Sequence, residues 1–139
     1  MKTLSRGREV EPTSPYLDYW LGEALLLKGR YGEAIAAFER VGAPAFGAGL
    51  KGYCYMRTGR ALEARKLLDE LMQSEPYPAL QLAFLHLGLD DIDSDFYWLE
   101  RSVELRSLGI HWMKVDPIWD PIRPDARFLR LLQRMNLAE

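Results

Sequence analysis

The residues that come closest to a chemical site in this sequence are three aspartates near the C-terminus. Asp116, Asp120 and Asp125 lie within VDPIWDPIRPDARFLRLLQRMN, residues 115–136, and each is adjacent to a proline. Carboxylate oxygens can ligate a metal ion or exchange protons with a substrate. A small hydrolase or metal enzyme is therefore one hypothesis, and it requires a pocket that gathers His111, Asp116 and Asp120.

Turn formation is the alternative role of the same segment. Proline disfavours helical geometry in the residue before it, so each Asp-Pro step breaks the chain into a short turn. Asp125 then stands where the N-cap of a last helix belongs. We expect the segment to close the fold, with the apolar side chains of Trp119 and Ile122 packed back against the preceding helices.

A second acidic cluster, in LDDIDSD, matches the start of a calcium-binding loop. Asp91, Asp93 and Asp95 have the spacing of the first three ligands of an EF-hand. That loop next needs a glycine and, at its twelfth position, a bidentate glutamate, whereas this chain has Phe96 and Ser102. We therefore expect an exposed turn that caps the following helix, whose dipole favours acidic groups at its start.

Other reactive side chains are few. His86 and His111 are the only histidines, and neither has a partner at the spacing of a metal site. We expect His86 at a solvent edge or in a groove, and the single cysteine, Cys54, as a packed thiol among apolar residues. Because the chain has no nucleophile-elbow, phosphate-loop or dinucleotide-binding motif, we predict a protein that is not an enzyme and uses no cofactor or metal.

Composition sets the general class. The chain has 139 residues, of which 48% are hydrophobic, enough for one domain with a continuous core. Its 18 basic and 20 acidic residues give a net charge of -2, so no long-range field recruits nucleic acid or anionic lipid. Arg127, Arg130 and Arg134 share one face of the last expected helix. We interpret them as a solvated face, with a patch for phosphate or an acidic partner as the alternative.

The N-terminal residues carry no targeting signal. Residues 1–14 are polar and aperiodic, which predicts a flexible arm, and they contain no apolar stretch of a signal peptide. No window approaches the roughly 18 consecutive apolar residues of a membrane helix. We expect a cytoplasmic protein with no membrane partner, and a single cysteine fits that compartment.

An internal repeat organises the first half of the chain. YWLGEALLLKGRYGEAIAAFERV (19–41) aligns with AGLKGYCYMRTGRALEARKLLDEL (48–71), so that Gly29-Arg30 recurs 30 residues later as Gly59-Arg60. Each unit has apolar residues three and four apart on both sides of that glycine, which predicts a helical hairpin. In the first helix, the residues expected to form the buried apolar face are Leu17, Trp20, Leu21, Ala24 and Leu25.

These units resemble the tetratricopeptide repeat. The residues that carry the resemblance are Leu21, Gly22, Gly29, Tyr31, Ala34 and Phe38 in the first unit, and Gly52, Tyr55, Gly59, Ala64 and Pro76 in the second. The period of 30 residues departs from the usual length of about 34. Lys51 also departs from the pattern, because the first unit has Leu21 at that place.

A third, degenerate unit spans residues 78–107. Its first helix is expected to end at Gly88, and Asp95 falls about where the earlier units have Ala34 and Ala64. Because a carboxylate without a partner is costly in that tight contact, we expect the hairpin to open or shift there. The stretch from Trp98 onward resembles the end-of-group segment that closes tetratricopeptide arrays in bacterial regulators, adenylate cyclases and signalling kinases.

The resemblance implies an all-α, right-handed solenoid of helical hairpins. We expect a flexible arm at 1–14 and a helical domain at 15–139. Within that domain the repeats span about 15–44, 45–76 and 78–107, and a C-terminal cap with one capping helix spans 108–139. The implied function is a non-catalytic adaptor for a protein or peptide segment in bacterial regulation or signalling. The alternative is a structural protein that self-associates through its repeat surface.

The resemblance also implies where a partner would bind. In tetratricopeptide arrays the first helix of each hairpin lines a concave groove. The residues that this places on the groove are Tyr16, Tyr19, Glu23, Leu26, Tyr53, Met56, Arg57 and His86. An equally weighted alternative is that several of them pack under the N-terminal arm or the C-terminal helix. A C-terminal carboxylate ligand is not expected, because the places that hold basic clamp residues in such arrays have Tyr19, Glu23, Gly49 and Tyr53 here.

Overall fold

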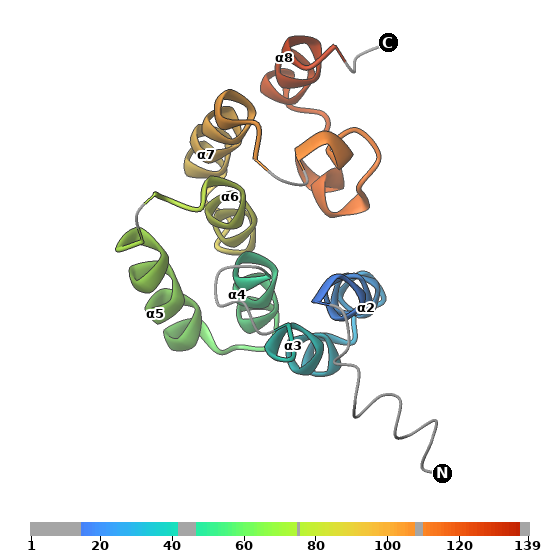
Figure 1. Ribbon diagram of the computed structural model, residues 1–139, viewed down its shortest axis with the longest axis vertical. Coiled ribbons are helices and arrows are strands. Elements are labelled where there is room, and N and C mark those ends of the chain that lie inside the picture. Colours follow the sequence, from blue (N-terminus) through green and yellow to red (C-terminus); the bar gives the residue numbers. More distant parts are fainter. Residues whose placement is uncertain (1–14, 42–46, 75, 108–109, 137–139) are drawn as a thin grey trace.

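In the computed structural model, the described residues are 15–41, 47–74, 76–107 and 110–136, and all of their regular secondary structure is helical (Figure 1). This confirms the predicted all-α class for that part of the chain. The elements are α2 (Pro15–Leu27), α3 (Tyr31–Glu39), α4 (Ala48–Arg57), α5 (Ala61–Met72), α6 (Ala79–Gly88), α7 (Ile92–Leu105), the short 3₁₀ helices η1 (Ile110–Trp112) and η2 (Pro117–Ile122), and α8 (Ala126–Arg134). The predicted arm at residues 1–14 lies outside the described ranges.

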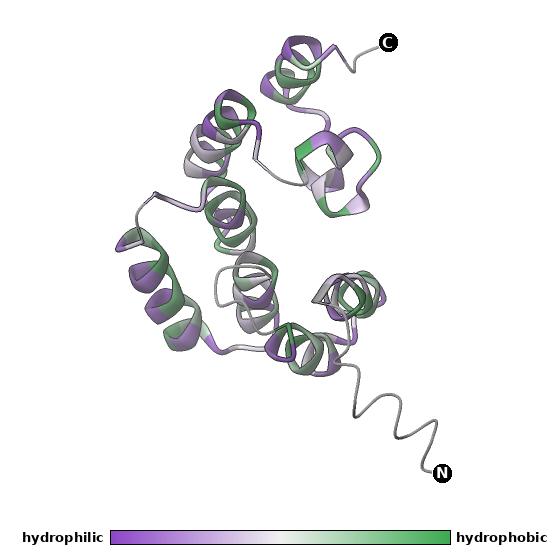
Figure 2. Cartoon of the chain, viewed as in Figure 1, coloured by the Kyte–Doolittle hydropathy of each residue, from purple (hydrophilic) through white to green (hydrophobic). Residues whose placement is uncertain are grey.

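Helix α6 is the centre of the molecule. Nine of its ten residues are buried, and hydrophobic residues cover most of its circumference (Figure 2). Such a helix must be surrounded on several sides. Figure 1 shows α4, α6 and α7 in a curved row, with α5 on one side and α2 and the C-terminal segment on the other. Helix α6 packs mainly on α4 and α7, while α2 packs on α3.

The three helix pairs are joined by turns of one geometry. A residue with left-handed backbone follows the first helix of each pair: Gly29 (φ 81°), Gly59 (φ 77°) and Asp90 (φ 61°). The next N–H then donates to a carbonyl five residues earlier, at 2.9, 2.8 and 3.0 Å respectively. This bond satisfies a carbonyl that the end of a helix leaves unpaired. Each pair is therefore a hairpin built on the same local plan.

The third hairpin differs from the sequence-based expectation. Helix α6 ends at Gly88, as expected, and the left-handed residue of the turn is Asp90, two residues later. Asp95 occupies the place of Ala34 and Ala64, five residues after the turn residue, and all three are 0% exposed. The prediction that the hairpin opens or shifts at Asp95 was therefore wrong. The turn is kept, and the carboxyl group is buried inside it.

Helix α2 also faces differently from the prediction. Leu17, Trp20, Leu21 and Ala24 were expected in the core but are exposed, the first three by 63, 46 and 45%. The buried face instead contains Gly22 and Glu23. A Cβ atom on Gly22 would lie 2.6 Å from the ring of Phe38, so the glycine allows α2 and α3 to approach closely. Since α2 has apolar residues on more than one side, their spacing alone did not identify the buried face.

Close backbone contact also joins α4 to α6. A Cβ atom on Gly49 would lie 2.2 Å from the carbonyl oxygen of Gln81, and one on Gly88 would lie 2.7 Å from the Cα of Tyr53. The Gln81 side chain accepts a hydrogen bond of 2.7 Å from the Gly49 N–H, one of the unpaired donors at the start of α4. Only glycine fits at these contacts, so they hold the second and third hairpins in one relative position.

The C-terminal segment packs back onto the third hairpin, as the sequence predicted. Trp119 and Ile122 are buried, and the indole of Trp119 stacks on the ring of Phe84 in α6, with centroids 4.8 Å apart and planes 14° apart. Arg123 donates to the carbonyl oxygens of Lys114 and Asp116, at 2.8 Å each, and so closes the loop that carries the indole. The segment is therefore an integral part of the core.

Truncation of the buried indole should destabilise the whole fold. We expect Trp119→Ala to lower the free energy of unfolding by about 3–5 kcal/mol, because it removes a large core side chain and leaves a cavity against Phe84. Urea denaturation followed by circular dichroism measures this change. Trp112→Ala, a matched change at a half-exposed indole of the same segment, should cost much less. Equal effects of the two substitutions would contradict the packing role of Trp119.

Candidate binding cavity

A cavity of about 530 Å³ opens between α2, the start of α6 and the C-terminal segment. Seven of the described residues that line it are Tyr, Trp or Phe. They are Tyr16, Tyr19 and Trp20 from α2, Tyr77 and Phe84 from the third hairpin, and Trp112 and Trp119 from the C-terminal segment. A cavity of this size with mainly aromatic walls is typical of a ligand or peptide-anchor site.

Contacts between aromatic rings give this cavity its shape. Trp20 of α2 and Trp112 of η1 meet edge to face, with centroids 6.0 Å apart, so they connect the two sides of the cavity. Tyr19 packs in the same manner on Phe38 of α3, at 6.0 Å. Edge-to-face pairs of this kind are favourable beyond the area that they bury. The walls are therefore held from three separate parts of the chain.

Two carboxyl groups lie in this aromatic surrounding. Glu23 is only 5% exposed, and Asp116 reaches the cavity from the segment before η2. Burial raises the pKa of Glu23, and a hydrogen bond with Asp116 and the charge of Asp116 raise it further. A hydrogen bond between two carboxyl groups requires that one of them carries the proton. Asp116 also accepts from the N–H of Ile118, at 3.1 Å, which fixes its orientation at the start of η2.

The carboxyl groups of the cavity have no basic partner among the described lining residues. No lysine or arginine is among the described lining residues, and Oε2 of Glu23 is buried without a hydrogen-bond donor. Burial, followed by the charges of Glu23 and Asp116, also raises the pKa of the Tyr19 hydroxyl. Ionised carboxylates in such a place attract a positively charged group or hold a proton. The cavity is therefore apolar in its walls and acidic at one point.

The residues predicted for the groove separate into two groups. Tyr16, Tyr19 and Glu23 line the cavity. Leu26, also on α2, is buried in the core and does not line it. The remaining four lie away from it. Met56 is partly buried against the core, Arg57 lies over the ring of Tyr53 at 4.6 Å, and His86 is buried near the end of α6.

Sequence reasoning missed the part of the cavity that the C-terminal segment supplies. Trp112 was not singled out, and Trp20 was placed in the core. Asp116 was interpreted as a turn residue, with a pocket beside His111 and Asp120 as the alternative. Trp20, Trp112 and Asp116 all line the cavity together with Tyr77, which directly precedes Pro78. The concentration of aromatic residues around the acidic Asp-Pro segment was the available signal. Its meaning depended on which helix lies opposite.

The three residues required by the enzyme hypothesis are not all at the cavity. His111 and Asp116 line it, but Asp120 is not among the lining residues and pairs with Arg123 at 2.7 Å. In the described ranges, no group of three or more His, Cys, Asp or Glu side chains is placed to hold a metal ion.

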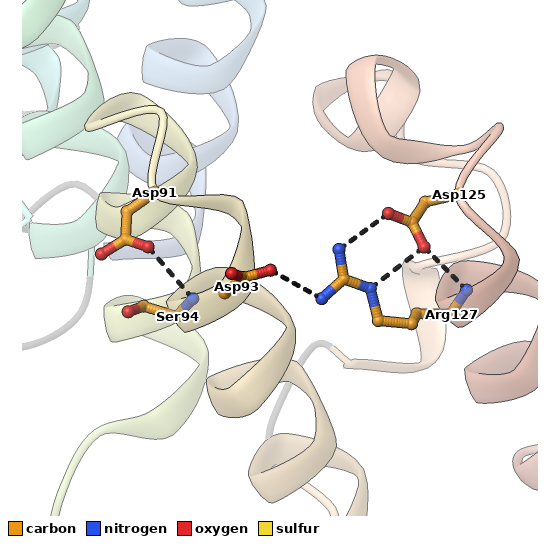
Figure 3. Close-up of polar contacts among 5 residues, drawn as sticks. All are labelled: Asp91, Asp93, Ser94, Asp125 and Arg127. Carbon is orange, nitrogen blue, oxygen red and sulfur yellow. Dashed lines mark hydrogen bonds and ion pairs between the residues drawn. The ribbon is translucent and has the colours of Figure 1, made fainter.

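The acidic turn before α7 has a structural role, as predicted. Asp91 is the N-cap of α7 and accepts a hydrogen bond of 3.2 Å from the N–H of Ser94 (Figure 3). Asp93 reaches across to α8, where Arg127 donates to it at 3.0 Å and to Asp125 at 2.8 Å (Figure 3). Asp125 is the N-cap of α8, which confirms that prediction too.

Arg127 therefore links two helices, which differs from its predicted place on a purely solvated face. Its guanidinium also lies over the ring of Phe96, 4.3 Å from the centroid. Arg134 lies 3.9 Å from Glu104 of α7, a second ion pair between the same two helices. Two of the three arginines of the final helix thus have partners within the protein. This arrangement favours a structural role for them over a phosphate-binding patch.

Two further reactive side chains are buried. Burial raises the pKa of Cys54 to about 12, although the nearby Arg57 acts in the opposite direction, so its sulfur remains a thiol at neutral pH, as predicted. His86 is buried and not at a solvent edge. Burial lowers its pKa despite the charge of Asp91, whose oxygen lies 3.7 Å from Nδ1. Neither residue lines the aromatic cavity.

Comparisons with protein-family models, with curated proteins and with solved structures find no match for this chain. The tetratricopeptide resemblance therefore depends on the residues quoted above and on the hairpin geometry. None of the described helices is long and apolar enough to cross a membrane.

Asp95 should make the stability of the protein depend on pH. Its burial, then the charge of Asp91, raise its pKa from an ordinary 3.8 to about 8, while Arg127 acts to lower it. Neither of its oxygens has a hydrogen-bond partner among the described residues. Between about pH 4 and pH 8 the folded state thus holds a proton that the unfolded state has released. The contribution of Asp95 to stability is therefore fully present below about pH 4. It declines as the pH rises and is lost once the pH passes about 8.

Replacement of this carboxyl group by an amide should remove that dependence. At pH 8 we expect Asp95→Asn to raise the free energy of unfolding by about 1–3 kcal/mol, because no buried charge remains. The gain should disappear near pH 4, and urea denaturation across this range measures it. Asp93→Asn, the same change at an exposed residue, removes the pair with Arg127 and should not stabilise. A stability difference between Asp95→Asn and wild type that is independent of pH would contradict the assignment.

Proposed function

We propose that this protein is a tetratricopeptide-like interaction module that binds a segment of another protein and catalyses no reaction. The three equivalent hairpin turns support the repeat assignment. Further support comes from the equivalent burial of Ala34, Ala64 and Asp95 and from the close contact of α4 with α6. Stacked hairpins of this kind form a right-handed solenoid with a concave face, which is the architecture that we propose.

The aromatic cavity is the observation that carries the binding proposal. It lies between the first helices of the first and third hairpins, the helices that the resemblance assigns to a concave surface. The C-terminal segment forms its other wall, so the site is a pocket bounded by the cap and not an open groove along the array. Aromatic side chains on a rigid scaffold anchor peptides well, because they bring a large contact area at a modest entropic cost.

Geometry also favours binding over catalysis by the carboxyl pair. Glycoside hydrolysis, a reaction that uses two carboxyl groups, needs them about 5–9 Å apart. Glu23 and Asp116 lie within hydrogen-bonding reach of each other. A pair within hydrogen-bonding reach is closer than this reaction requires, which favours a non-catalytic role.

The resemblance of the C-terminal segment gives the proposal a setting. Segments of this type close helical-repeat regions in bacterial regulators and signalling proteins. We therefore place the module in a bacterial regulatory or signalling system in the cytoplasm, as an adaptor for a protein partner. The buried Trp119 supports the closing role of the segment.

Selection of peptides from a random phage-displayed library against the full chain tests the binding proposal. Peptides selected on wild type should bind Tyr16→Ala at least ten-fold more weakly in fluorescence anisotropy, because the ring lines the cavity. Tyr53→Ala is the matched control, since this ring lies on α4 outside the cavity and should not affect binding. Selected peptides that bind both variants as tightly as wild type would place the site elsewhere.

Self-association is a second candidate function, and the outer face of α2 favours it. Leu17, Leu21 and Leu27 are exposed there beside Trp20, at helical spacing. If this stripe joins copies of the chain, light scattering at micromolar concentrations should give a dimer or larger species. Leu17→Glu should then yield a monomer, whereas Leu62→Glu on the exposed side of α5 should not. A wild-type monomer across the concentration range would contradict this function.

A further inference from the structure

The acidic point of the cavity has no counter-charge in the described part of the chain. Glu23 is 95% buried, lines the cavity, and has an Oε2 atom without a hydrogen-bond donor. Asp116 adds a second carboxyl group beside it. Buried carboxylates in proteins are usually paired with a cation or with several donors. The described lining residues include no lysine or arginine that could serve.

The rings around this pair suit an organic cation better than a metal ion. Trp20 and Trp112 meet edge to face in the wall of the cavity, and Tyr16 and Tyr77 line it as well. Aromatic faces attract ammonium groups through their quadrupole, and several rings around one charge form the aromatic cages that bind alkylated ammonium. A hard metal ion is bound by oxygen ligands and bound water, whereas this wall is mainly aromatic.

We propose that the cavity binds an alkylammonium group, the lysine or methylated lysine side chain of a partner peptide, with its charge at Glu23 and Asp116 and its stem against the aromatic rings. This inference rests on the proposed function and identifies the chemistry of the bound segment. The cation takes the place of the proton that the raised pKa of Glu23 keeps on its carboxyl group. Binding should therefore strengthen as the pH rises and that proton is lost. His111 and the tyrosines Tyr16, Tyr19 and Tyr77 are the other titratable groups that line the cavity.

Choline and 3,3-dimethylbutan-1-ol are the probes for this site, because they have nearly the same shape and differ in charge. Titration into the full chain, followed by the indole N–H signals in NMR spectra, should give saturable binding of choline at least ten-fold tighter than of the alcohol. This comparison uses the wild-type protein, so it does not depend on the folding of any variant. Equal affinities for the two probes, or no binding of choline, would overturn the proposal.

Substitution of the carboxyl groups then locates the charge. Glu23→Gln keeps the shape of the side chain and should weaken choline binding at least ten-fold, with the dependence on pH reduced. Asp120→Asn removes a carboxylate of the same segment that lies outside the cavity and pairs with Arg123, so it should leave the affinity unchanged. If Glu23→Gln retains full affinity while its melting curve matches wild type, the charge is not bound at this point.

The chain's own N-terminal residues are the competing occupant. Arg6 and Arg8 lie outside the described ranges, and either could supply the cation. In the full chain, the double substitution Arg6→Ala and Arg8→Ala should not change the affinity for choline. A ten-fold or larger gain in the affinity for choline would show that an arginine of the same chain occupies the cavity. That result would overturn the proposal that the cation belongs to a partner.

The peptide selection distinguishes failure of this inference from failure of the proposed function. Selected peptides should contain lysine and bind Glu23→Gln at least ten-fold more weakly. Peptides without a basic residue that still lose affinity on Tyr16→Ala would overturn the cation and leave the interaction module intact. Charge-selective binding of choline, together with peptides that ignore the cavity, would uphold the cation site and contradict the module.

Discussion

The stack of Trp119 on Phe84 is the contact on which the candidate site depends. Helix α6 is buried on almost all sides, and this indole stacks on one of its aromatic rings. The stack fixes η2 against the third hairpin, and the hydrogen bonds of Arg123 hold the loop before it. As a result, Asp116 and Trp112 lie opposite α2. Without that anchor the cavity would have only one wall.

Two buried acids show how one kind of side chain can act differently in one fold. Asp95 occupies the position that alanine has in the other two hairpins. Burial keeps it protonated at neutral pH, and it does not line the aromatic cavity. Glu23 is nearly as buried, but its carboxyl group lies at a cavity beside Asp116. The first therefore opposes stability when it is ionised. The second can offset the same cost by binding a cation.

The acidic groups of the cavity agree with the sequence-based prediction that the ligand is not a C-terminal carboxylate. A carboxylate-binding clamp needs basic residues along the concave surface, and the corresponding places here have Tyr19, Glu23, Gly49 and Tyr53. In the structure, Tyr19 and Glu23 line the cavity, while the backbone of α6 occupies the space beside Gly49. Charge repulsion and lack of space therefore both oppose a carboxylate in this position, and they favour a ligand of opposite charge.

The sequence by itself determined the local features: the helical class, the turns at Gly29 and Gly59, the N-caps at Asp91 and Asp125, and the packing of the Asp-Pro segment as a cap. These depend on residues a few positions apart, whose conformational preferences act within one turn of chain. Tertiary structure decided which face of α2 is buried, since Phe38 could select Gly22 only once α3 was in place. It also brought Glu23 beside Asp116. A contact between such distant positions follows from the packing of whole helices, and local spacing carries no record of it.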